Sequence, residues 1–331
     1  MDQYTPPYEI TDRMTALISD ISEKLGRIDA TGRSLTMPHL RHNNRIRSVH
    51  SSLRIEANSL TTDQVRDVID GKPVTGPASQ IREVKNAYEA YLQIDRIDPY
   101  QTAELKRLHG IMMEDLIDES GIYRNGEEGV YNGEQCIFMA PPARLVPSLV
   151  EELFGWMKDN RSRVHPLILS SVFHYEFVFI HPFADGNGRM ARLWQTVLLA
   201  GWKPVFADLP VESQIERYQG AYYKAIADCH KAGSSTVFIE FMLEQIDEAL
   251  DAFTVRENAA AGADSPYVER LLMCMDPDLS YSAAQLLTLL GLKSRQTLRM
   301  HYLDPAMRKG LVEMTIPEKP SSRNQRYRRK R

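Results

Sequence analysis

Apolar residues recur at helical spacing along most of this chain. The first predicted helix carries its apolar face at Met14, Leu17, Ile18, Ile21 and Leu25 and ends at Gly26. Further helices are predicted at about residues 38–58, 62–70, 80–94, 101–117, 147–159, 166–180, 187–201, 212–231 and 235–254. The segment 166–180 is the longest apolar-rich run; it contains His174 and Glu176, and it is predicted to be a buried core helix rather than a membrane span.

The helical pattern is lost between residues 121 and 146. Glycine, asparagine and proline residues punctuate a short β-prone piece that contains Gln135, Cys136 and Ile137 and stops at Pro141. This predicts a small β-hairpin. Two interpretations stay open at this point: an ordinary surface hairpin, or one whose exposed edge receives an extended peptide by strand addition.

The C-terminal part has its own pattern. Residues 258–265 are small and polar, as in a linker, and helices are predicted at 282–290 and 295–302, followed by a strand-like piece from 310. This order resembles a winged helix-turn-helix. We therefore divide the chain into a helical N-terminal extension (1–37), a main domain (38–255), a linker (256–264) and a winged-helix domain (265–331).

Composition narrows the class of protein. The chain has 331 residues, 43% hydrophobic and 25% charged, with a net charge of −4, as expected for one large and one small globular domain. It shows no signal-peptide pattern and no long apolar span, so we expect neither secretion nor membrane insertion. The three cysteines, Cys136, Cys229 and Cys274, form no CxxC pair, which makes a disulfide or zinc role weak and favours the cytoplasm.

The candidate chemistry is concentrated between His181 and Arg192, where an apolar helix gives way to a short loop and a second helix. Gly186 and Gly188 let backbone amides approach a ligand closely. The N-terminus of the following helix is an anion site. Arg189 and Arg192, three apart on one helix face, can hold separate phosphates.

A base and a metal ligand complete this set. His181 has an ordinary pKa near neutrality and suits a general base, and Asp185 offers a hard oxygen to Mg²⁺ held jointly with phosphate oxygens. Each residue alone is compatible with an ordinary helix start, but their convergence favours phosphoryl or nucleotidyl transfer.

The stretch resembles the signature of the Fic domain family, H-P-F-x-[D/E]-G-N-G-R-x-x-R, at every fixed position. The resemblance implies a helical fold with a small β flap, formed here by Gln135, Cys136 and Ile137, and transfer of AMP from ATP to a hydroxyl of a target protein. It assigns the base to His181, Mg²⁺ (or Mn²⁺) to Asp185, and the γ-phosphate to Arg192. Phosphate and nucleotide contacts fall to the rest of the loop, namely Gly186, Asn187, Gly188, Arg189, Met190 and Ala191.

Gly188 separates two branches of this family. The related Doc-type kinases have lysine at that position, so glycine favours AMP transfer over phosphorylation. The resemblance does not identify the target protein. Self-modification is expected, and a homodimer is possible.

A second motif, Ser52 to Asn58, resembles the inhibitory helix of Fic proteins, [S/T]-x-x-x-E-[G/N]. The resemblance implies that Glu56, on the same helix face as Ser52, pairs with Arg192 and keeps it from the γ-phosphate. Ala57 departs from the pattern, which leaves the end of the helix open. In some relatives the same glutamate also serves removal of AMP from the target, and a solvated surface charge is the alternative for Glu56.

Tyr222 and Tyr223 resemble the aromatic pair that borders the adenine in this family, although packing in the core explains either residue equally well. Two rival functions remain. One is a DNA-binding regulator with a nucleotide-sensing core, and the other is a Fic enzyme that uses another donor, such as UTP, GTP or CDP-choline. Because the second C-terminal helix offers only Arg295, Gln296, Arg299 and His301 to bases, a partner or dimer role is favoured over nucleic acid for that domain.

Overall fold

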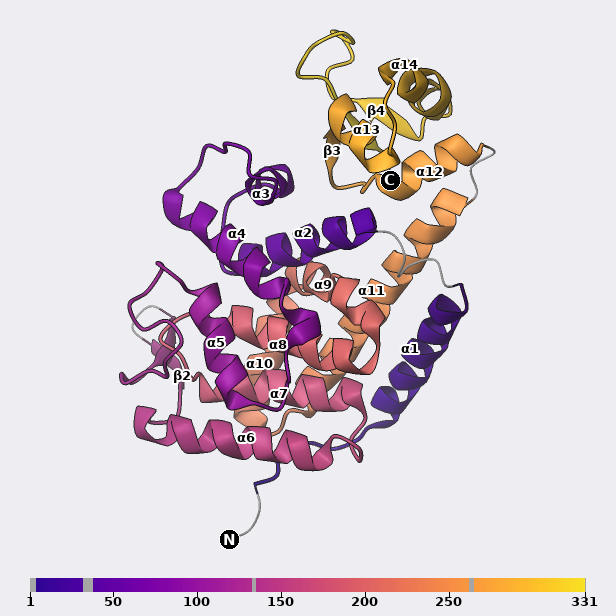
Figure 1. The fold of residues 1–331 in the computed structure, drawn as a ribbon. Coiled ribbons are helices and arrows are strands. Elements are labelled where there is room, and N and C mark those ends of the chain that lie inside the picture. Colours follow the sequence, from indigo (N-terminus) through magenta and orange to yellow (C-terminus); the bar gives the residue numbers. More distant parts are fainter. Residues whose placement is uncertain (1–3, 32–37, 133–134, 262–264, 331) are drawn as a thin grey trace.

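The computed structural model describes residues 4–31, 38–132, 135–261 and 265–330 (Figure 1). The chain is mainly α-helical with two small antiparallel sheets, as predicted. The α-helices before residue 262 are α1 (Asp12–Thr31), α2 (Pro38–Ile55), α3 (Thr62–Ile69), α4 (Ala78–Tyr91), α5 (Thr102–Met112), α6 (Val146–Asn160), α7 (Pro166–Ile180), α8 (Asn187–Trp202), α9 (Val211–Arg217), α10 (Gln219–Ala232) and α11 (Thr236–Ala261). Short 3₁₀ turns are η2 (Ile94–Arg96), η3 (Ala143–Leu145) and η4 (Pro204–Asp208).

Several predicted boundaries are wrong, and packing explains most of them. Helix α1 continues through Gly26 because its apolar face packs along α11, which outweighs the low helix propensity of glycine. The helix predicted at 212–231 is two helices, since α9 packs on α2 while α10 packs on α11, and the chain turns at Tyr218 between them. Helix α11 runs to Ala261 into the predicted linker, where the alanines favour helix.

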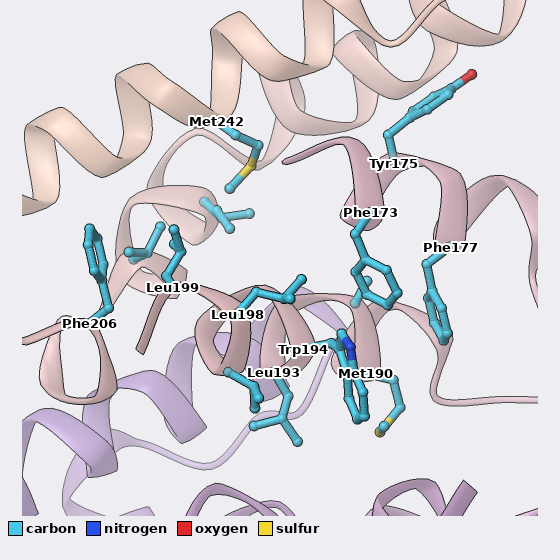
Figure 2. Packing of buried hydrophobic residues seen from close by; sticks show 14 of the residues in the cluster. Phe173, Tyr175, Phe177, Met190, Leu193, Trp194, Leu198, Leu199, Phe206 and Met242 are labelled. Carbon is cyan, nitrogen blue, oxygen red and sulfur yellow. The ribbon is translucent and has the colours of Figure 1, made fainter. Parts of the chain in front are cut away.

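The buried helix predicted at 166–180 is confirmed as α7, and it forms the centre of the main core with α8. Figure 2 shows Phe173 and Phe177 of α7 facing Trp194 and Met190 of α8. The rings of Phe173 and Trp194 lie 6.1 Å apart, in the range of favourable aromatic packing. Because α7 and α8 are joined by the loop that holds His181, this core fixes both ends of the loop.

The two small sheets lie outside this core: the predicted hairpin and the sheet of the C-terminal domain. In the hairpin, β1 (Gly129–Asn132) pairs with β2 (Gln135–Met139), with a register shift between Val130 and Tyr131. Gln135, Cys136 and Ile137 therefore lie on β2; the contacts of their side chains lie outside the described part of the structure.

The C-terminal domain (residues 265–330) has its own hydrophobic cluster. Its elements are α12 (Pro266–Cys274), β3 (Ser280–Ser282), α13 (Ala283–Leu290), α14 (Arg295–Thr297), the π-helical turn η5 (Leu298–Leu303), α15 (Asp304–Arg308), β4 (Val312–Met314) and β5 (Arg326–Arg329). The sheet order is β3-β5-β4, and both strand pairs are antiparallel. Strands β3 and β5 give no clear signal in the sequence because each is short and polar.

Helix α2 connects this domain to the main core. Its Arg47 Nε lies 2.9 Å from Asp276 Oδ2, and the same guanidinium also pairs with Asp278. The amide of Asn43, also on α2, donates to the hydroxyl of Tyr281 at 3.1 Å. From α3, Arg66 Nη1 donates to the Ser280 carbonyl at 2.6 Å. Polar groups that are paired and buried thus join the two domains.

Within the described residues, none of the helices combines the length and apolar character that a bilayer crossing requires.

Candidate functional site

The loop between α7 and α8 has an unusual backbone at both ends. His181 follows the last residue of α7 with φ 52° and ψ 60°, a left-handed conformation that costs a residue with a side chain about 1–3 kcal/mol. Gly186 precedes α8 with φ 82°, and a β-carbon there would lie 2.7 Å from the sulfur of Met113. Helix α8 therefore begins at Asn187, where its first amide N–H groups face the loop and form an anion site.

His181 is positioned as a neutral base. Its Nδ1 lies 3.3 Å from the carbonyl of Val178 and donates to it, so Nε2 carries the lone pair that can accept a proton. Burial lowers the pKa of His181 below its ordinary value, an effect that the Val178 carbonyl only partly opposes. The imidazole is consequently unprotonated at neutral pH, as a general base must be.

Arg124, which precedes the hairpin, holds His181 in place. Its Nε donates to the His181 carbonyl at 2.6 Å, and its Nη2 donates to the Pro141 carbonyl at 2.6 Å. A third bond joins its Nη1 to the Gly126 carbonyl at 2.8 Å. One buried guanidinium thus fixes the start of the loop between α7 and α8 and both ends of the segment that carries the hairpin. Nothing in the local sequence points to this role, because the partners lie up to 57 residues away.

His109 supports the loop from the side of α5. Its Nδ1 accepts the amide proton of Gly121 at 2.8 Å, so its Nε2 carries the hydrogen and donates to the Asp185 carbonyl at 2.9 Å. The ring stacks on Phe183 with centroids 3.6 Å apart. Burial lowers the pKa of His109 to about 4, so the ring stays neutral and keeps this tautomer. The sequence gives no reason to choose this histidine.

Asn187 has both ends of its side-chain amide occupied by the loop itself. Its Oδ1 accepts from the Phe183 amide at 2.9 Å, and its Nδ2 donates to the Phe183 carbonyl at 2.7 Å. In this arrangement the side chain shapes the loop, which leaves the backbone amides to meet phosphate. Met190 and Ala191 are fully buried, backbone included, and the Met190 amide donates to the Gly186 carbonyl at 2.9 Å, so neither residue is open to a nucleotide in this structure.

Asp185 points its carboxylate into the open part of the loop, where its side chain is 58% exposed. Its Oδ1 lies 2.9 Å from Nη2 of Arg189. The described residues contain no group of three or more histidine, cysteine or acidic side chains that could hold a metal. A Mg²⁺ ion would therefore depend on Asp185 together with phosphate oxygens, an arrangement that Mg²⁺ commonly adopts.

Arg192 lies about one helical turn after Arg189 on α8, and residues at the C-terminal end of α2 bind its guanidinium. Its Nη2 donates to Glu56 Oε1 at 2.7 Å and to the Ser52 carbonyl at 3.0 Å, and its Nε donates to the Ser52 hydroxyl at 3.0 Å. Burial alone would lower the pKa of Arg192, but the carboxylate of Glu56 holds it above the ordinary value. The structure thus brings together three residues that the sequence places in two distant motifs.

Gly188 makes room for this contact. A β-carbon at Gly188 would lie 2.5 Å from Glu56 Oε1 and 3.1 Å from Nη1 of Arg192. No side chain fits there while Glu56 occupies its present position.

Helix α2 ends in the turn that carries Glu56. The helix stops at Ile55, and Ala57 takes φ 64°, the left-handed conformation that Gly and Asn adopt more readily. The amide of Asn58 then donates to the Leu53 carbonyl at 3.0 Å, as in a Schellman end. The question left open by Ala57 is thereby answered: the helix ends before Glu56, and alanine accepts the strain.

The two tyrosines on α10 differ in environment. Tyr222 is buried, and its hydroxyl lies 3.0 Å from Nε2 of His174 in the core. Tyr223 is 47% exposed, and its pKa is raised by partial burial and by the nearby Glu56. Of the pair, Tyr223 is the one open to solvent, whereas Tyr222 is buried close to Arg192, whose charge opposes the rise that burial causes in its pKa.

Comparison with known proteins agrees with this geometry. Residues 99–199 match the Fic/DOC family, and residues 266–329 match the C-terminal domain of "Filamentation induced by cAMP protein Fic-like". A Fic family protein from Desulfovibrio desulfuricans G20 of known structure is 42% identical, with a TM-score of 0.73 over 98% of each chain. The structure of Fic-1 from Caenorhabditis elegans is 17% identical, with a TM-score of 0.57 over 75% of this chain and 72% of that one.

Curated relatives are more distant. Protein adenylyltransferase fic-1 of Caenorhabditis briggsae is 26% identical over 242 residues, which is 65% of this chain and 45% of that protein. Protein adenylyltransferase Fic of Drosophila virilis is 26% identical over 220 residues, 62% of this chain and 42% of the relative. The chain thus spans less than half the length of these relatives.

Proposed function

This chain is a Fic family protein, and we propose that it is a protein adenylyltransferase that transfers AMP from ATP to a hydroxyl side chain. One observation carries the proposal. A neutral imidazole, the first-turn amides of α8 and the guanidinium of Arg192 converge on one loop, which supplies a base, an anion site and a phosphate contact.

The groups of this chain divide the reaction between them. Nε2 of His181 takes the hydroxyl proton, the freed oxygen bonds to the α-phosphorus, and the bond from that phosphorus to pyrophosphate breaks. The amides of α8 hold the phosphates in line with the attacking oxygen. Asp185 would hold Mg²⁺, which neutralises phosphate charge when bound.

We further propose that the contact between Glu56 and Arg192 inhibits the enzyme. While Glu56 Oε1 accepts from Arg192, that guanidinium cannot grip the γ-phosphate. ATP then lacks the contact that would align its α-phosphorus with the base. A second role of Glu56, assisting removal of AMP from a modified target, is an extension of this proposal.

Labelling of the protein by its own activity tests both proposals. Glu56→Gly is expected to increase self-labelling from ATP and Mg²⁺ at least about tenfold, a bias of about 1.4 kcal/mol. His181→Ala in the Glu56→Gly background should lower it by roughly 10²–10⁴-fold. Mass spectrometry of the product, with ATP, GTP, UTP and CDP-choline offered separately, identifies the donor and the modified residue.

Each outcome of this experiment has one meaning. Equal labelling by the wild type and Glu56→Gly at saturating Mg²⁺ and ATP would contradict inhibition by Glu56. Labelling that survives His181→Ala would contradict the assignment of the base, and preference for another nucleotide would change the donor alone. Release of AMP from pre-labelled protein by the wild type, but not by Glu56→Gly, would support the second role of Glu56.

The pH dependence of labelling tests the state of His181. Because burial lowers its pKa, the imidazole keeps its lone pair to a pH below the ordinary value of about 6.5. The initial labelling rate of Glu56→Gly should therefore fall to half only below about pH 6.5 as the solution is acidified. A midpoint above that value would contradict a buried neutral base.

A further inference from the structure

The C-terminal domain has a charge opposite to that of the rest of the chain. Between residues 266 and 331 there are 13 lysine and arginine residues against 6 aspartate and glutamate residues, a net charge of +7. Since the whole chain carries −4, residues 1–265 carry −11. Such asymmetry between parts of a chain points to a polyanionic partner for the basic part.

One group of exposed basic residues lies at the end of the domain that faces away from the main core, whereas the exposed Arg328 and Lys330 line a cavity shared with Arg47 of α2. Figure 1 shows α14 and the loop between β4 and β5 together at this end, with α2 and α11 on the opposite side of the domain. The second helix of the helix-turn-helix consists of α14, η5 and α15 in succession. Arg295 and Arg299, near its start, are exposed. Lys319 and Arg323 in the loop are exposed as well. The acidic groups nearby are Glu318 in the loop and Asp304, which lies 3.7 Å from Arg299.

The helix presents a short polar edge as well as charge. Arg295, Gln296 and Arg299 occupy positions one and four apart at its N-terminal end, and all three are exposed. Their positions match those from which a recognition helix contacts base edges in the major groove. Arg299 lies within the π-helical turn η5, and Pro305, which has no amide hydrogen for the carbonyl of His301, comes soon after this turn.

We propose that this end of the C-terminal domain, formed by the second helix and the β4–β5 loop, binds duplex DNA. The helix enters the major groove, where arginine pairs with guanine and glutamine with adenine, while the loop contacts phosphates. Duplex RNA does not fit this arrangement, because its major groove is too narrow and deep for a helix. The sequence alone favours a partner module, since it does not show that helix and loop share one free end.

Fluorescence anisotropy of the full chain with a labelled mixed-sequence DNA duplex tests this site. The wild type should bind, with affinity falling steeply as salt rises. Arg295→Glu with Arg299→Glu should weaken binding at least about tenfold and flatten the salt dependence by about one unit of slope for each phosphate that is no longer neutralised. Lys319→Glu with Arg323→Glu should act in the same direction.

A charge-matched control separates a site from general attraction. Lys158 and Arg163 are exposed near the end of α6, on the far side of the molecule from α14 (Figure 1). Lys158→Glu with Arg163→Glu changes the net charge by the same amount and should leave binding nearly unchanged. Far-UV circular dichroism confirms that each variant is folded. The proposal is overturned if the wild type shows no salt-dependent binding, or if the control weakens binding as much as Arg295→Glu with Arg299→Glu.

Discussion

Helix α2 and the turn that follows it carry two ion pairs of different kinds. Near its middle, Arg47 and Asp276 are both about as buried as core residues, with side chains 6% and 5% exposed. At its C-terminal end, Arg192 is 1% exposed, but Glu56 is 33% exposed. In the first pair both side chains are closed to solvent. In the second pair the carboxylate is open to solvent, so another anion can take its place on the guanidinium.

We propose that this difference separates a structural ion pair from one that exchanges partners. A closed pair cannot exchange partners without exposing two buried charges, which is costly. In the Glu56 contact, the buried guanidinium keeps its bonds to Ser52 while the exposed carboxylate is the part that a phosphate would replace. One helix thus joins a permanent domain contact to a contact that is suited to exchange.

Removal of Arg47 should give the largest effect. Arg47→Ala leaves Asp276 buried without its cation, and we expect the free energy of unfolding to fall by about 3–5 kcal/mol in urea denaturation followed by circular dichroism. The matched change on the same helix is Arg54→Ala, since Arg54 is 47% exposed and lies 3.6 Å from Glu216. That variant should lower the same free energy by less than about 1 kcal/mol.

Self-labelling from ATP measures the second of the two ion pairs. If the two pairs have separate roles, Arg47→Ala changes stability, while Glu56→Gly changes labelling. If Arg47→Ala increased self-labelling as much as Glu56→Gly does, the roles of the two ion pairs would not be separable.

The smallest effect is expected at Ala57. Ala57→Gly relieves the left-handed backbone and should raise the free energy of unfolding by about 0.5–1 kcal/mol. Ala16→Gly, at an exposed position inside α1, should lower it by a similar amount because there glycine only loosens the helix. If both variants changed the free energy of unfolding in the same direction, the inference that the Ala57 backbone is strained would be wrong.

The sequence is informative where chemistry is local. His181, Asp185 and Arg192 lie within twelve residues, so their spacing alone places a base, a carboxylate and a guanidinium around one helix start. The apolar-rich run of residues 166–180 likewise locates α7 as the buried centre of the core, where its polar residues His174 and Glu176 are buried with hydrogen-bond partners.

The sequence does not predict contacts between residues that are far apart along the chain. Arg124 and His109 shape the loop through backbone carbonyls 57 and 76 residues away, and any residue can supply a carbonyl. Asp276 and Arg47 meet across more than two hundred residues, so neither carries a local signal. The Asn187 amide shows a related limit, since its position in the motif does not say whether it faces the loop or the ligand.

The space beside Gly188 restricts how this chain can diverge. A β-carbon at that position and the carboxylate of Glu56 compete for the same volume, so a descendant that acquires a side chain at 188 must move or lose the carboxylate. A return to glycine would restore the room but not a missing glutamate. Positions 56 and 188, far apart in the gene, should therefore be coupled among related proteins, with glycine at 188 wherever the glutamate keeps the position that it has here.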